Sequence, residues 1–158
     1  MDERALFLKF WKKEAPATRA VIARIPEGSE YRPDPKSRTA RDIAWLVVYE
    51  EIALADGLEK GVFQWKDTPT PATAKEILDT YDRSHDALTT RLERLTPAQL
   101  EQQVPFVFGG QELMKARGLD SAWGFLFDII HHRGQLSTYL RPMGSTVPQI
   151  YGPTADEP

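Results

Sequence analysis

Four long segments of this sequence place their apolar residues three and four positions apart, which is the period of an amphipathic α-helix. The predicted helices cover residues 2–15, 39–57, 73–95 and 111–140. Pro16 allows a break in the first before a further helical stretch over 18–25, and the last can be broken at 118–120. No succession of alternating strands and no internal repeat is visible. The sequence therefore predicts an all-α four-helix bundle with long crossover loops.

The segments between these helices are rich in proline and glycine. We predict a structured loop over 57–71, a short helical turn over 96–99, and a loop with an extended apolar middle over 104–110. The tail over 147–153 has apolar anchors but little helix propensity. It is expected to be ordered, non-helical and packed across the bundle.

Length and composition indicate an ordinary globular protein. The 158 residues fit one domain covering 1–158, which is large enough to bury a core without disulfides. The longest apolar runs fall far short of a bilayer span, and the charged start of the chain shows no signal peptide. We therefore expect a cytoplasmic protein that is not inserted in a membrane.

Charge and cysteine content exclude several classes of site. The chain has no cysteine, so disulfides, thiolate zinc sites and a cysteine nucleophile are absent. Its 20 basic residues are dispersed among 23 acidic ones, giving a net charge of -3. Because no basic stripe can neutralise a phosphate backbone, nucleic-acid binding is not expected.

The last predicted helix carries an unusual group of polar side chains in an apolar setting. Residues 128–141 hold two of the three histidines of the chain, together with Asp128. Asp128 and His132 are four residues apart and so lie on one helix face, where they can chelate one divalent ion. A tight site needs a third ligand from a facing helix.

This region resembles the DinB/YfiT-like superfamily. The resemblance rests on the run 131–141, on Val147-Pro148 and Ile150-Tyr151-Gly152-Pro153 after it, and on Ala44-Trp45 in the second helix. It extends in order and spacing over nearly the whole chain. It implies a DinB-like four-helix bundle, often a homodimer, with a divalent metal held by three histidines.

The resemblance places those histidines at positions 46, 128 and 132, and only His132 is present. Leu46 cannot ligate and Asp128 exchanges an imidazole for a carboxylate. Glu50, one turn beyond Leu46, and Asp42, one turn before it, are candidates for the third ligand. Such a set suits zinc, nickel or manganese. The alternative is no cofactor.

Without a metal, the polar groups of this helix are expected to form a buried ion pair. His132 would pair with Asp128, or Arg133 with a glutamate, holding the second helix against the last.

Other residues near the motif have less specific roles. The residues predicted to line a pocket between the second and last helices are Leu46, Trp45, His131, Gln135 and Tyr139. His131 is about 100° around the helix from His132, so it can instead face solvent or another helix. Gly134 is expected to allow a close approach of a neighbouring segment. His85 is expected to make a hydrogen bond at the surface or within the bundle.

Two functional hypotheses follow. Leu46 favours a small-ligand-binding or stress-response bundle with a degenerate metal site. The alternative is a metal-dependent transferase or hydrolase, of the thiol-transferase kind, that uses Asp128, His132 and the Glu50 carboxylate as ligand or base. The sequence does not indicate the substrate or ligand.

Overall fold

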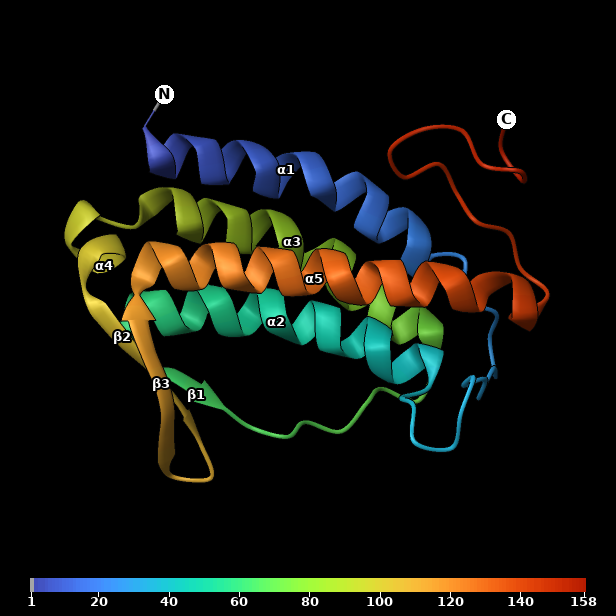
Figure 1. The fold of residues 1–158 in the computed structure, drawn as a ribbon, viewed down its shortest axis with the longest axis horizontal. Coiled ribbons are helices and arrows are strands. Elements are labelled where there is room, and N and C mark those ends of the chain that lie inside the picture. Colours follow the sequence, from blue (N-terminus) through green and yellow to red (C-terminus); the bar gives the residue numbers. More distant parts are fainter. Residues whose placement is uncertain (1) are drawn as a thin grey trace.

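Four long helices form the body of the protein in the computed structural model, which describes residues 2–158 (Figure 1). They are α1 (Glu3–Ile22), α2 (Ala40–Lys60), α3 (Ala74–Arg94) and α5 (Gly118–Leu140). Two short helices, α4 (Pro97–Glu101) and η1 (Arg141–Met143), follow α3 and α5. The predicted bundle and the predicted helical turn after α3 are therefore present. None of the helices in residues 2–158 is long and apolar enough to cross a membrane.

The apolar faces of the four long helices meet in one core. The most deeply buried members include Trp11, Val47, Leu54, Ile77, Leu92, Leu126 and Leu136. Burying each large aliphatic side chain contributes about 1.5–3 kcal/mol. The helix α2 contacts both α3 and α5, which explains why its middle is apolar on more than one side.

Side-chain caps fix where α2 begins. The Thr39 hydroxyl accepts a hydrogen bond from the Asp42 backbone N–H at 3.1 Å, and the Asp42 carboxylate accepts one from the Thr39 backbone. Such a cap stabilises a helix by about 1 kcal/mol. Thr70 also donates to Asp42 at 2.6 Å. Asp42 is therefore committed to the helix start and is not a third ligand beside Asp128 and His132.

A small sheet at one end of the bundle corrects the all-α prediction. Its strands are β1 (Phe63–Trp65), β2 (Gln103–Phe108) and β3 (Gln111–Arg117), in the order β1-β2-β3. The first pair is parallel, with Phe63 opposite Phe106, and the second is antiparallel. In Figure 1 the β2–β3 hairpin projects from the bundle below α2 and α5.

Pairing between strands explains these errors of prediction. Residues 111–117 are good helix formers, but pairing with β2 overrides that propensity. The turn at Gly109 and Gly110 has φ angles of 57° and 80°, which suit a tight hairpin and favour glycine. The helix predicted from residue 111 therefore begins only at Gly118, where the sequence had allowed a break.

The break allowed at Pro16 does not occur, because α1 runs continuously from Glu3 to Ile22. Proline removes the hydrogen bond to the carbonyl four residues earlier. Pro16 and Lys12 are both exposed, so water can hydrate that carbonyl without loss of the core contacts.

A buried arginine joins α1, α5 and the C-terminal tail. Arg133 is 2% exposed, and its Nη2 lies 2.8 Å from Glu14 Oε2 in α1. The Tyr151 hydroxyl of the tail accepts from Arg133 at 2.6 Å and donates to Glu14 at 2.7 Å. The ordered tail thus packs across the bundle as predicted. The ion pair holds α1 against α5. The prediction that Arg133 holds the second helix against the last is therefore wrong.

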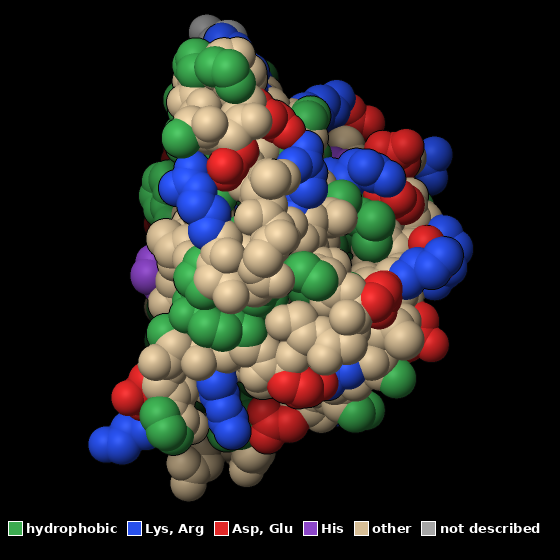
Figure 2. All heavy atoms as spheres, turned by 90° about the vertical axis from the view of Figure 1, so that its right-hand side faces the viewer, with side chains coloured by type: hydrophobic (Ala, Val, Ile, Leu, Met, Phe, Trp, Pro, Cys, Tyr) green, Lys and Arg blue, Asp and Glu red, His purple; other side chains and the backbone are tan. Residues whose placement is uncertain are grey.

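The surface carries mixed charge. Seen from the end that holds η1 and the tail, acidic and basic side chains are interspersed, and neither sign forms a continuous patch on this face (Figure 2). Ion pairs near the C-terminal tail include Arg141 with Asp156 and the half-buried pair Arg24 with Glu157.

Arg133→Met is expected to lower the free energy of unfolding by about 3–5 kcal/mol, because the Glu14 carboxylate would stay buried without its cation. Replacing both partners, Glu14→Met with Arg133→Met, should recover a large part of this loss. Urea unfolding followed by circular dichroism measures both. A double variant as unstable as Arg133→Met alone would contradict the role assigned to the pair.

Candidate metal centre and cavity

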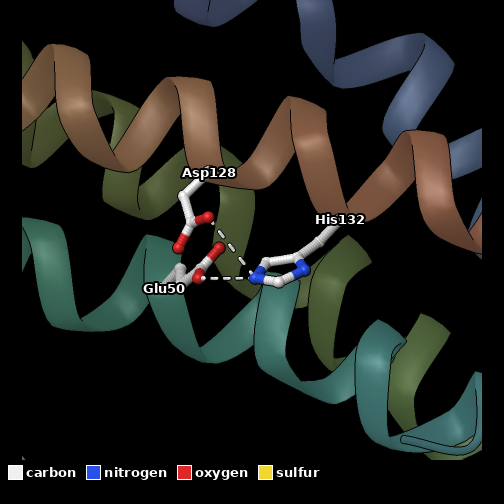
Figure 3. A group of neighbouring side chains, drawn as sticks. All are labelled: Glu50, Asp128 and His132. Atoms are coloured by element: carbon white, nitrogen blue, oxygen red, sulfur yellow. Dashed lines mark ion pairs between the residues drawn. The ribbon is translucent and has the colours of Figure 1, made fainter. Parts of the chain in front are cut away.

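Three potential ligands from two helices converge between α2 and α5 (Figure 3). Asp128 and His132 point from adjacent turns of α5, and Glu50 points toward them from α2. His132 Nε2 lies 3.5 Å from Asp128 Oδ1 and 3.7 Å from Glu50 Oε1. One donor atom of each residue lies within 4.8 Å of the other two. The four-residue spacing in α5 and the packing of α5 on α2 together produce this cluster.

Glu50 occupies an environment that disfavours its charge. The residue is 3% exposed, and its Oε2 has no hydrogen-bond partner in the described chain. Burial, followed by the nearby Asp128 carboxylate, raises the pKa of Glu50 to about 10. Two carboxylates this close are stabilised by a proton or by a cation between them.

Gln135 orients the imidazole of His132. His132 Nδ1 donates to Gln135 Oε1 at 3.0 Å, which leaves Nε2 directed at the two carboxylates. A hydrogen bond on one ring nitrogen fixes which nitrogen is free to ligate. The arrangement thus directs Nε2 of His132 at the cluster.

The donor set fits a divalent cation. Atoms bound to one ion at roughly 2.0–2.2 Å lie about 3 to 4 Å from each other, and the two measured separations fall in that range. Two carboxylates match the charge of such an ion. Leu46 stands one turn before Glu50 and lines the same cavity, so Glu50 is the residue of α2 that could offer a donor atom here.

The three residues lie at the wall of a cavity of about 620 Å³. Most of its lining is apolar and comes from α2, α5 and the sheet: Leu46, Phe63, Trp65, Val104, Phe106, Met114 and Phe125. Arg38, Asp120 and Ser121 add polar groups. A volume of this order suits a small organic molecule.

Of the predicted pocket residues, only Leu46 lines this cavity. Trp45 lies at an adjoining hollow, which shares Leu46 and Trp65 with the cavity, and its Nε1 donates to Thr68. Tyr139 is buried against Tyr31 with an edge-to-face contact at 5.5 Å. His131 is exposed, and Gln135 reaches the site only through His132. These side chains leave the helices in other directions than those of Glu50 and His132, so the structure does not bring them to this cavity.

The sheet residues of the cavity were missed because their segments were interpreted as loops. Alternation was the available evidence: Phe63 and Trp65, and likewise Val104 and Phe106, are two residues apart, with a Gly-Gly turn after β2. Arg38 has no comparable pattern in the sequence.

Two further predictions concern residues away from this cavity. Gly134 is exposed, and a Cβ built there would meet nothing within 4 Å, so the close approach expected of it is wrong. His85 makes the hydrogen bond within the bundle that we had considered, with Nδ1 at 2.9 Å from Glu51 Oε2. Its ring stacks on Trp11 and Tyr81.

Comparison with known proteins gives consistent matches over most of the chain. The model of the DinB family matches residues 1–158. The uncharacterized protein YrdA of Bacillus subtilis is 31% identical over 156 residues, covering 96% of this chain and 89% of that protein.

Two crystal structures share the fold. A DinB-like protein from Bacillus cereus has a TM-score of 0.74 at 26% identity, covering 92% of this chain and 95% of its own. YjoA, a DinB-like protein from Bacillus subtilis, has a TM-score of 0.72 at 23% identity, covering 92% and 97%.

Glu50→Gln is expected to raise the free energy of unfolding by about 1–3 kcal/mol at neutral pH when a chelator keeps the protein free of metal. The Glu50 pKa is about 10 in the folded protein against an ordinary 4.5, so the folded state retains a proton that the unfolded chain has released. The contribution of Glu50 to the free energy of unfolding of the parent therefore falls as the pH rises from 4.5 to about 10. The neutral amide of Glu50→Gln has no such pH dependence.

Urea unfolding at about pH 5, 7 and 9 measures the difference, which should grow with pH. Glu112→Gln on the exposed β3 strand is the matched control and should follow the parent. A Glu50→Gln variant with the same pH dependence as the parent would contradict the burial of an ionisable Glu50.

Proposed function

Since this chain belongs to the DinB family, we propose that its function resides in the cavity between α2 and α5 and depends on a divalent cation held by Glu50, Asp128 and His132. One observation carries the proposal: the buried Glu50 carboxylate, whose Oε2 has no hydrogen-bond partner in the described chain, faces a second carboxylate and the Nε2 atom of His132. Buried charged groups are paired or bind metals. Zinc, nickel and manganese suit this mixed set of oxygen and nitrogen donors.

The activity that this site supports best is metal-dependent transfer or hydrolysis on a small, largely apolar molecule. When bound, a divalent cation makes water or a thiol a nucleophile near neutral pH by lowering its pKa. Glu50 and His132 would hold the ion from the buried side, with Gln135 fixing the imidazole. The Asp128 side chain is 56% exposed, so solvent and substrate can reach the cluster there.

The second candidate is a binding protein without a catalytic metal. Leu46 supports it, because it places an apolar side chain at the cavity wall where the family resemblance implies a histidine ligand. In that case the cavity would hold a small ligand, and the proton shared by Glu50 and Asp128 would replace the cation. A role in a stress response and the expected cytoplasmic homodimer stay predictions.

Metal titration separates the two candidates. Calorimetry with zinc or manganese on untagged protein should show about one ion per chain, with affinity rising with pH because Glu50 must lose its proton. Glu50→Gln and His132→Ala should each weaken metal binding by roughly 10–100-fold or more. Loss of a group that only supports a ligand already costs that much.

His131→Ala is the matched control, since His131 is the exposed neighbour of His132 and should leave binding unchanged. Failure of the parent protein to bind either metal would favour the metal-free candidate. Equal losses in His131→Ala and His132→Ala would show that the ion binds elsewhere.

A further inference from the structure

We infer that the ligand of this cavity is a small organic anion with a flat apolar body, and that Arg38 selects its charge. The inference rests on the proposed function, because it assumes the cation at Glu50, Asp128 and His132. It adds the chemical class of the ligand and a residue outside the metal cluster that recognises it.

Arg38 is an exposed residue that lines both this cavity and the hollow beside Trp45. It lines the cavity just before α2 begins, and no carboxylate of residues 2–158 lies within ion-pair distance of it. Arg41, three residues later, pairs instead with Glu30 at 2.5 Å. Burial and Asp128 together raise the pKa of Glu50. Arg38 is near enough for its positive charge to act in the opposite direction on that pKa.

The other charged residues of the cavity have partners. Asp120 lies 2.7 Å from Arg117, which also pairs with Glu3 and Glu101. Glu50 and Asp128 would together match a divalent cation. Among the charged residues of the lining, Arg38 is the cation that has no ion-pair partner in residues 2–158. A guanidinium binds a carboxylate or a phosphate through two parallel hydrogen bonds, so the complementary ligand group is an anion.

Aromatic rings define the other part of the ligand. Trp65 and Phe106 lie nearly parallel at 5.8 Å, and Phe63 lies 5.0 Å from Phe125, so β1, β2 and α5 supply the rings that line one cavity. Flat apolar groups pack well on such rings. A polyanion such as nucleic acid is a poor match, because it needs many cations and the lining supplies one.

Matched probes test the inference on the full chain loaded with zinc or manganese. Naphthoate and naphthamide have the same ring system and differ in charge. Naphthoate is expected to bind the parent about ten-fold or more tightly than naphthamide, since a hydrogen bond to a charged group contributes that much. Fluorescence titration measures both affinities.

In protein saturated with metal, Arg38→Gln should abolish the preference for naphthoate while leaving naphthamide binding unchanged. Arg38→Lys should retain part of it, because the charge stays. Arg32→Gln, an exposed arginine of the same connection that is absent from the cavity lining, is the control and should behave as the parent.

The outcomes distinguish this inference from the proposed function. A parent protein that binds metal but does not prefer naphthoate, or a preference that survives in Arg38→Gln, would overturn the role of Arg38 alone. A parent that binds no metal would overturn the proposed function itself, and with it the charge balance used here.

Discussion

The packing of α5 against α2 is the contact on which both the fold and the candidate site depend. Leu126 and Leu136 of α5 and Val47 and Leu54 of α2 are buried in the core around this contact. The same packing brings Glu50 across to Asp128 and His132. Close packing leaves little freedom in the distance between facing side chains. The geometry of the site is thus maintained by the burial of apolar residues on neighbouring turns.

Two adjacent residues of α5 have separate roles because they point in different directions. His132 faces α2 and the carboxylates, whereas Arg133 faces α1, Glu14 and the tail. Consecutive residues of a helix are about 100° apart, so one short motif can serve two interfaces. The part of the motif that resembles the DinB family therefore combines a candidate ligand with a buried ion pair that anchors the C-terminal tail.

The buried carboxylate of Glu50 is costly for the folded protein in isolation. Desolvation disfavours its charge, and a second carboxylate nearby adds to that effect. Proteins retain such groups where a ligand or a reaction uses them. Apolar residues at this position would stabilise the bundle more, so the cost itself supports a functional role for this side of the cavity.

The sequence by itself determined the four helices, the short turn after α3, the ordered tail and the convergence of Asp128 with His132. The helices, the turn and the Asp128–His132 pair follow from local spacing or capping, and the tail follows from its apolar anchors. Only the tertiary structure decided the rest: that β3 is a strand in spite of its helix-forming residues, that Arg133 pairs with Glu14, and that Glu50 rather than Asp42 reaches the site. The physical reason is that strand pairing, burial and charge pairing join residues far apart in the chain, and local periodicity does not record which of them will meet.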